Sequence, residues 1–168
     1  MTTTVAEATI PTASLPAEAA AAALAFASAE PQQSLNVFGV QVDILLTAEQ
    51  TGGAYSVYRV GAEPGAGSPP HVHLRDDEAF YVLEGTFDFM VGGETRRLTA
   101  GQFVFLPRNI PHAFTGAGET KGWLLGIGSP AGHEQFFVDA SRLSFPPDPA
   151  EAAEVVRRHG MNSVPYMM

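Results

Sequence analysis

Three histidines and one glutamate stand in two short stretches of the chain, in an arrangement that suits metal binding. His71 and His73 are two residues apart, so an extended backbone points both imidazoles to the same side. Glu78 follows five residues later, just before an apolar run, and His112 comes after a Pro-rich turn. Imidazole nitrogens and a carboxylate suit a divalent transition ion. We therefore expect the fold to gather these four side chains around one metal.

The composition is that of one globular domain with many turns. The 168 residues are 45% hydrophobic and include 17 Gly and 13 Pro, which favours an all-β fold over a helical one. Lys and Arg number 9 against 18 Asp and Glu, so no basic patch favours nucleic acid or an anionic membrane as a partner. The chain has no cysteine, which excludes disulfides and thiolate ligands.

The first part of the chain carries no targeting or membrane signal. No stretch of about 20 apolar residues is present, so we expect no transmembrane helix. A secretory signal needs positive charge before its apolar stretch, but Glu7 and Glu18 stand before the Ala-rich stretch here. We therefore predict a cytoplasmic protein. The segment from Pro16 to Ala29 is typical of a short helix, and a partly ordered tail accounts for it equally well.

From Val37 onward the pattern changes to short strands separated by turns. About nine apolar or alternating runs follow as far as Ile127, which is typical of an antiparallel sandwich or barrel. We expect one continuous strand over 37–46. Beyond Pro130 the pattern becomes helical, with Asp148 as the N-cap of a last helix that ends near His159.

Two segments of the chain resemble the sequence motifs of the cupin family. The first motif is matched at every position, as Gly65-x5-His71-x-His73-x4-Glu78-x6-Gly85. The second is matched in part by Gly101-x5-Pro107 and His112. Its usual Gly after the Pro is Asn109 here, which a left-handed backbone position would explain, and its final Asn is Gly116.

The resemblance spans about residues 37–127. It implies a single-domain cupin, an all-β antiparallel jelly-roll β-barrel with short N-terminal and C-terminal helices. We divide the chain into an Ala/Pro-rich arm with a possible short helix (1–35), the barrel (36–130) and a helical extension (131–168). In the family the four positions held here by His71, His73, Glu78 and His112 bind one divalent ion, which is Ni, Mn, Fe, Co, Cu or Zn.

Cupin barrels commonly pair through a sheet, so the resemblance also implies a homodimer. The extended stretch Asn36–Thr47 is a candidate to cross to the partner. The need to cover outward apolar residues, such as Tyr81 and Leu83, favours the same expectation.

Strand alternation predicts an apolar pocket beside the metal. Counted from Glu78, Phe80 and Val82 point inward, and Phe114 points the same way as His112. We predict that these three line a substrate pocket, with Tyr58 and Trp123 at its mouth. The alternative for most of these residues is a plain core position.

The other polar residues near the motif are predicted at the surface. His133 opens a predicted helix, and cover of the barrel mouth is its alternative role. His159 is a cation at a helix C-terminus. Arg75, Asp76 and Asp77 face solvent, with a hydrogen bond to a ligand histidine as the alternative.

Within the cupins, the runs PPHVHLRDDEAFYVLEG and FVFLPRNIPHAF are most similar to bacterial one-domain proteins grouped with quercetin 2,3-dioxygenases. This resemblance implies a metal-dependent dioxygenase that cleaves a flavonol-like enol or phenol with O2, with Glu78 taking the hydroxyl proton. One alternative is a non-oxidative metal-dependent isomerase or polyketide cyclase. The other is a cupin that binds a small molecule without turnover.

Overall fold

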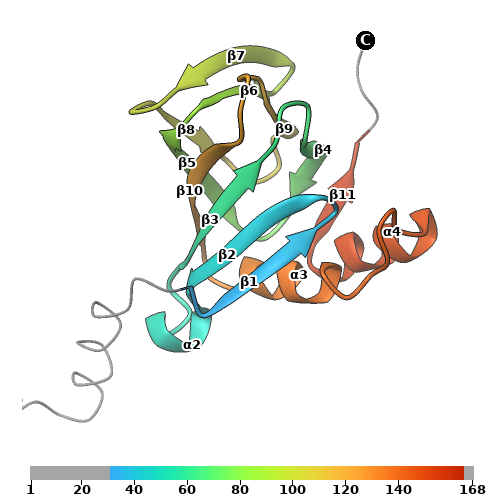
Figure 1. Ribbon diagram of the computed structural model, residues 1–168. Coiled ribbons are helices and arrows are strands. Elements are labelled where there is room, and N and C mark those ends of the chain that lie inside the picture. Colours follow the sequence, from blue (N-terminus) through green and yellow to red (C-terminus); the bar gives the residue numbers. More distant parts are fainter. Residues whose placement is uncertain (1–30, 165–168) are drawn as a thin grey trace, which may run out of the picture. The chain divides into compact units, whose positions relative to one another are not determined.

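The computed structural model describes residues 31–164, and the helix expected over Pro16–Ala29 lies outside them (Figure 1). In these residues eleven strands and three helices follow one another. The elements are β1 (Gln33–Val37), β2 (Val40–Leu46), α2 (Ala48–Thr51), β3 (Ser56–Ala62), β4 (Gly67–His73), β5 (Asp77–Glu84), β6 (Thr86–Val91), β7 (Glu94–Thr99), β8 (Phe103–Leu106), β9 (His112–Gly116), β10 (Gly122–Ser129), α3 (His133–Ala140), α4 (Pro149–Arg158) and β11 (Met161–Ser163).

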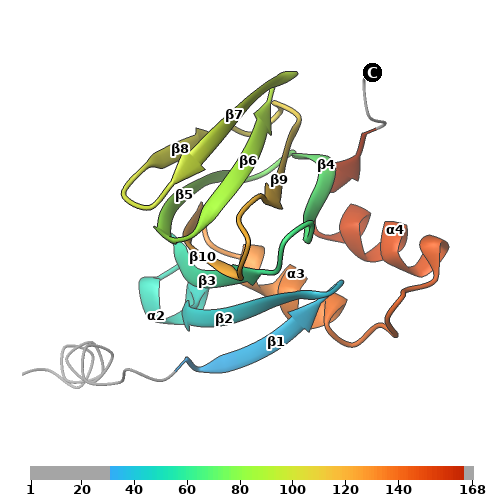
Figure 2. The same cartoon turned by 45° about the horizontal axis from the view of Figure 1, so that its top comes forward.

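The strands form two sheets that face each other (Figure 2). One sheet has six strands in the order β1-β2-β3-β10-β5-β8, and the other has five in the order β11-β4-β9-β6-β7. Neighbouring strands pair antiparallel in both sheets. This is the antiparallel jelly-roll architecture that the sequence predicts. None of the helices in residues 31–164 is long and apolar enough to cross a membrane.

Alternation along β5 follows the prediction and fills the space between the sheets. Phe80 and Val82 are buried, whereas Tyr81 and Leu83 are 42% and 44% exposed on the outer face. Burying such an apolar side chain contributes about 1.5–3 kcal/mol. The inward residues of both sheets therefore stabilise the barrel, whereas the outward residues contribute little to its core.

The continuous strand expected over 37–46 is wrong, because the chain reverses within it. Phe38 and Gly39 have φ values of 53° and 90°, and the Gly39 amide donates to Asn36 Oδ1 at 3.1 Å. These left-handed positions make the β1–β2 hairpin, and β2 then pairs with β3. The stretch Asn36–Thr47 is thus paired within its own chain, and the homodimer stays a prediction.

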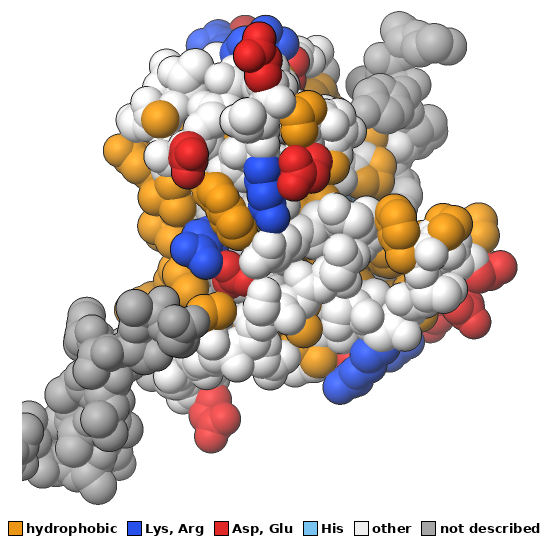
Figure 3. All heavy atoms as spheres, in the orientation of Figure 1, with side chains coloured by type: hydrophobic (Ala, Val, Ile, Leu, Met, Phe, Trp, Pro, Cys, Tyr) orange, Lys and Arg blue, Asp and Glu red, His pale blue; other side chains and the backbone are white. Residues whose placement is uncertain are grey.

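Apolar side chains gather on the outer face of the six-stranded sheet (Figure 3). Tyr81, Phe103, Phe105 and Ile127 are each more than a third exposed there, on β5, β8 and β10. Tyr81 and Phe103 are directly opposite each other across the β5–β8 pair.

The C-terminal segment does more than add helices. Asp148 caps α4 as predicted, accepting from the amides of Ala150 and Glu151 at 2.9 and 3.1 Å. After α4 the chain returns as β11, which the sequence pattern did not predict, and Met161 pairs with His73. This segment therefore lies beside the strand that carries two of the histidines.

A buried carboxylate ties the hairpin to the rest of its sheet. Asp43 is 1% exposed and accepts from Ser34 Oγ at 2.6 Å, Arg59 Nε at 3.0 Å and Gln41 Nε2 at 3.0 Å. Burial raises the pKa of Asp43, but the hydrogen bonds from Ser34, Arg59 and Gln41 outweigh it and hold the pKa below its usual range.

We predict that Asp43→Ala lowers the free energy of unfolding by about 2 kcal/mol, because it leaves the Arg59 guanidinium and Ser34 without their buried partner. Urea unfolding measures the change. The control is Asp88→Ala, which breaks an Asp–Arg pair with Arg97 on the exposed surface and costs less than about 1 kcal/mol. Equal losses in the two variants would contradict the assigned role of Asp43.

The stabilisation contributed by Asp43 should depend on pH. Since the folded-state pKa of Asp43 is lowered, its stabilisation is complete above the ordinary value of about 3.9 and is lost as pH falls through the folded-state value. The stability difference between wild type and Asp43→Ala should therefore shrink below about pH 4. A difference that grows on acidification would contradict this assignment.

Candidate metal centre

The four predicted ligand residues meet in the space between the two sheets. His71 and His73 lie on β4, and His112 begins β9 as the direct partner of His71. Glu78 comes from β5 in the opposite sheet. One ligand atom from each of these residues lies within 4.8 Å of the others, and His73, Glu78 and His112 are buried. The structure thus brings together all four residues that the sequence singled out.

Each histidine is oriented by an oxygen on the far side of its ring. Nδ1 lies 2.9 Å from the Pro69 carbonyl in His71, 3.0 Å from the Ile110 carbonyl in His112, and 2.8 Å from Asp76 Oδ2 in His73. Carbonyl and carboxylate oxygens only accept, so we assign the hydrogen of each ring to Nδ1. The lone pairs of all three Nε2 atoms are then directed into the cluster.

This arrangement fits a metal ion. The Nε2 atoms of His71 and His73 lie 3.1 Å apart, and neither has a hydrogen for the other in the assigned tautomers. His112 Nε2 is buried and has no hydrogen-bond partner among residues 31–164, and it lies 3.8 Å from Glu78 Oε2. Two nitrogens bound at right angles to one ion, each at about 2.1 Å, lie about 3.0 Å apart. The cluster can therefore hold a divalent ion with the three Nε2 atoms and Glu78 Oε2.

The protonation states of the site suit the same use. Burial, then the charges of His112 and His73, lower the pKa of His71 to about 3. Burial, then the charge of His73, lowers the pKa of His112 to about 4. Burial also lowers the pKa of His73, but the hydrogen bond to Asp76 and the charge of Glu78 outweigh it and raise the pKa. His71 and His112 are thus neutral imidazoles at neutral pH, the form that binds metals.

The second oxygen of Glu78 is held by a tyrosine. The Tyr58 hydroxyl donates to Glu78 Oε1 and is fully buried. Burial and the charge of Glu78 raise the pKa of Tyr58 well above its usual value, so this hydroxyl stays a donor. Gly126 makes room for the ring, since a Cβ there would lie 2.2 Å from Tyr58 Cε2. Tyr58, expected at the pocket mouth, therefore lies behind the glutamate.

Two surface predictions are wrong. Asp76 is only 6% exposed, because it turns inward to hold His73, which was the alternative. His133 is only 8% exposed, and its ring stacks on that of His73 with centroids 4.6 Å apart. Asp77 behaves differently and pairs with Arg108 at 2.7 Å. Asp76 follows His73 by three residues, and this short spacing was a local signal that Asp76 could hold the His73 ring. No local sequence pattern places His133 against that ring.

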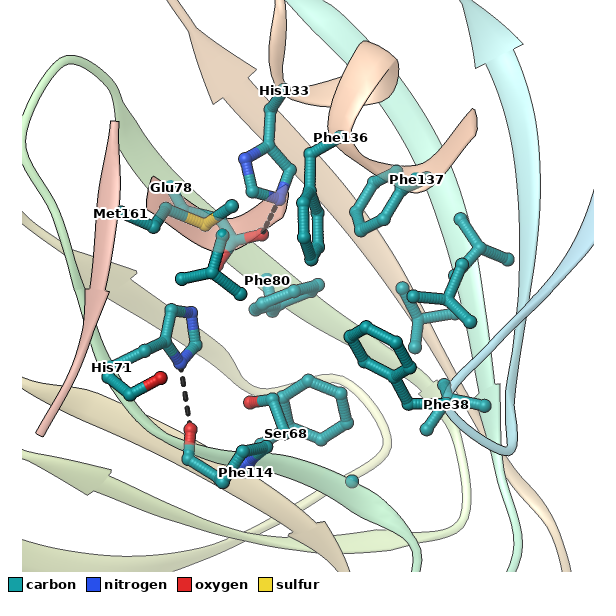
Figure 4. Close-up of a pocket in the computed structure, with 18 residues that line it drawn as sticks. Phe38, Ser68, His71, Glu78, Phe80, Phe114, His133, Phe136, Phe137 and Met161 are labelled. Carbon is teal, nitrogen blue, oxygen red and sulfur yellow. Dashed lines mark hydrogen bonds and ion pairs between the residues drawn. The ribbon is translucent and has the colours of Figure 1, made fainter. Parts of the chain in front are cut away.

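A cavity extends from the cluster between the sheets, and α3 covers one side of it (Figure 4). Phe80 and Phe114 line it, as the sequence predicts for pocket residues. Val82 is fully buried in the core and does not line it. Trp123 is also absent from the lining, because its neighbour Leu124 points inward and alternation turns the indole outward. The cavity residues are Val37, Phe38, Val40, Val42, Val60, Gly67, Ser68, Pro69, His71, Glu78, Phe80, Phe114, His133, Phe136, Phe137, Val156, Met161 and Ser163.

The two departures from the second motif have backbone reasons. Asn109 has a φ of 65°, the left-handed position expected from the sequence. Gly116 is explained by a close approach, since a Cβ there would lie 2.6 Å from the Glu63 carbonyl oxygen. Neither departure alters the ligand set.

We predict that Asp76→Ala weakens Co2+ binding about 10-fold to 100-fold, because His73 loses the partner that fixes its ring. Competition with a chromophoric chelator measures the affinity. Asp77→Ala is the matched control, since Asp77 pairs with Arg108 and should leave the affinity nearly unchanged. Equal affinities in the two variants would show that Asp76 does not orient the site.

The sequence of this chain is similar to a known protein family. Residues 58–127 match the family model described as Cupin domain. Nectarin-1 of Nicotiana plumbaginifolia is 31% identical over 96 residues, which are 52% of this chain and 42% of that protein. The chain spans half or less of the length of the curated relatives that it matches.

Two solved structures share the fold. An RmlC-like cupin from Shewanella frigidimarina is 26% identical with a TM-score of 0.53, over 61% of this chain and 87% of that one. A predicted oxalate decarboxylase from Thermotoga maritima is 24% identical with a TM-score of 0.54, over 60% of this chain and 92% of that one, and shows the fold alone. Residues 58–127 are thus similar in sequence to a cupin domain, and the chain shares the fold of these two structures.

Proposed function

We propose that the protein is a metal-dependent dioxygenase that cleaves an apolar, aromatic enol or phenol of the flavonol type with O2. The observation that carries the proposal is the distribution of polarity in the cavity. Glu78, His71 and His133 lie together at one part of its wall, whereas aromatic and aliphatic side chains form most of the rest. A flat apolar molecule with an oxygen at one edge matches that distribution.

The lining also argues against a small dianion as substrate. The described residues around the cavity include no Lys, Arg, Asn or Gln. A dicarboxylate such as oxalate, the substrate named for the Thermotoga maritima protein, would have a bound ion for one carboxylate but no cationic side chain in the lining for the other. Phe80, Phe114 and Phe137 instead offer ring faces and edges to an aromatic ligand.

One further polar group on the wall favours a hydroxylated ligand. Ser68 Oγ is buried and has no hydrogen-bond partner among the described residues, and Ser68 lines the cavity. An unsatisfied hydroxyl costs free energy that a ligand oxygen can recover. A polyhydroxylated aromatic compound would therefore gain from this wall as well as from the metal end.

When bound, a divalent transition ion would supply Lewis-acid polarisation of the substrate oxygen and so lower its pKa. The ligands would be His71, His73 and His112 through Nε2 and Glu78 through Oε2. The chain's own acid–base chemistry then falls to Glu78 Oε1, the carboxylate oxygen that the ion would leave free, which accepts the substrate's hydroxyl proton. The Tyr58 hydrogen bond holds that oxygen in place while the proton moves.

The rest of the cavity controls what reaches the reacting atoms. Phe136 and Phe137 on α3 and Met161 on β11 cover the substrate with apolar surface. Such a wall excludes water and leaves room for O2, which is itself apolar. The non-oxidative alternatives, an isomerase or a polyketide cyclase, would use the same metal and base without O2.

Oxygen consumption is the test of the proposal. Protein reconstituted in turn with Fe, Mn, Co and Ni should consume O2 in the presence of a flavonol such as quercetin, with one metal most effective. His112→Ala should abolish the uptake, because it removes a ligand. A rearranged product formed without O2 uptake would favour the isomerase or cyclase, and binding without any product would favour a binding protein.

We also predict that Glu78→Gln lowers turnover about 100-fold or more while part of the metal is retained, because the amide cannot accept the proton. Metal analysis and O2 uptake on the same samples measure both effects. The control is Glu84→Gln, at the exposed end of the same strand, which should leave turnover unchanged. Unchanged turnover in Glu78→Gln would remove Glu78 as the base.

A further inference from the structure

His133 is a buried polar side chain that the proposed chemistry leaves without a role. It is the first residue of α3, outside the segment matched to the cupin domain, and its ring is 8% exposed. The ring stacks on His73 at 4.6 Å and meets Phe137 edge to face at 4.7 Å. Neighbours on both sides therefore fix its position.

Asp76 sets the orientation of this ring. His133 Nδ1 lies 3.4 Å from Asp76 Oδ2, the same oxygen that holds His73 Nδ1 at 2.8 Å. Because a carboxylate only accepts, we assign the hydrogen of the His133 ring to Nδ1 as well. One buried carboxylate thus directs two imidazoles, and the Nε2 lone pair of His133 is left to face Glu78 across the cavity wall (Figure 4).

The distance between His133 Nε2 and Glu78 Oε1 suits a hydroxyl that bridges the two atoms. His133 Nε2 lies 3.9 Å from Glu78 Oε1, which is too long for a hydrogen bond. An oxygen set to one side of the line between these atoms lies within about 2.8 Å of both, the ordinary distance for a hydrogen bond. Both atoms are acceptors in the assigned states, so a hydroxyl there shares its one hydrogen between them in a three-centre hydrogen bond.

We propose that His133 is a substrate-binding residue, whose Nε2 shares with Glu78 Oε1 the single hydrogen of one substrate hydroxyl. The proposal rests on the proposed function, since it concerns the hydroxyl of the aromatic enol. It deepens that function by naming what the site selects: a free hydroxyl on the flat ligand, in preference to hydrogen or an ether at the same position. His133 contributes to binding and leaves the metal to the four other residues.

The test is a binding measurement under anaerobic conditions, which prevents turnover. The protein is loaded with Co2+, and 3-hydroxyflavone and flavone, which differ in one hydroxyl, are titrated by their absorbance. Wild type should bind 3-hydroxyflavone about tenfold more tightly than flavone. His133→Phe should remove most of that preference by weakening 3-hydroxyflavone, with flavone affinity and Co2+ content unchanged.

Two further variants separate the roles of the ring. His133→Gln supplies a side-chain oxygen as acceptor and should restore part of the preference. His159→Phe is the matched control, because His159 pairs with Asp139 at 2.9 Å and does not line the cavity. It should keep the wild-type affinities for both flavones.

Four outcomes would overturn the proposal, and each one points to a different explanation. Equal affinities of wild type and His133→Phe for 3-hydroxyflavone would leave His133 without a binding role while the proposed function stands. Loss of Co2+ from His133→Phe would assign the ring to the metal instead. No binding of either flavone by wild type would remove the proposed substrate class together with this inference. If His133→Phe does not fold, the inference remains testable with wild type, because equal affinity for the two flavones would overturn it.

Discussion

The register between β4 and β9 is the constraint on which the site depends. It sets His71 opposite His112 and, through alternation, turns His73 to the same side. A slip of one residue would point the histidines of one strand away from the space between the sheets. The inward aromatic residues fix the phase of β9 from its other side, because Phe114 on β9 and Phe89 on β6 face each other and are both buried. Core packing and the ligand geometry therefore both depend on the position of β9, which pairs with β6 on one side and with β4 on the other.

Hydrogen bonding then decides what the buried histidines can do. Their Nδ1 atoms are matched to the Pro69 and Ile110 carbonyls and to Asp76, which leaves Nε2 lone pairs in a closed space. Such a cluster is costly while its lone pairs face one another, and an ion removes that cost. The same physical reason explains why Tyr58 is a hydrogen-bond donor to Glu78, since the carboxylate has one oxygen outside the metal cluster. The polar centre is thus suited to hold a cation.

Sequence reasoning reached what is local or periodic and missed what depends on packing. Spacing identified four side chains that the fold brings together, alternation identified Phe80 as inward, and the left-handed backbone at Asn109 followed from residue type. The reversal at Phe38 escaped because a bulky residue rarely adopts positive φ. The role of His133 escaped because α3 must first fold back over the sheets. Trp123 was misplaced because the run GWLLGIG is apolar throughout, so its phase could not be read from the sequence.

The candidate metal ligands and much of the cavity lining come from different parts of the chain. The four metal-binding positions all fall within residues 58–127, the part matched to the cupin domain. Much of the cavity lining comes from outside residues 58–127: Phe38 from the β1–β2 hairpin, Phe137 from α3 and Met161 from β11. These walls therefore lie outside the part of the chain that the cupin domain model matches. Since a bound ion would present similar chemistry in each such barrel, the walls must decide which molecule reaches it. Substrate assignments for this chain therefore have to be argued from its own hairpin and C-terminal segment.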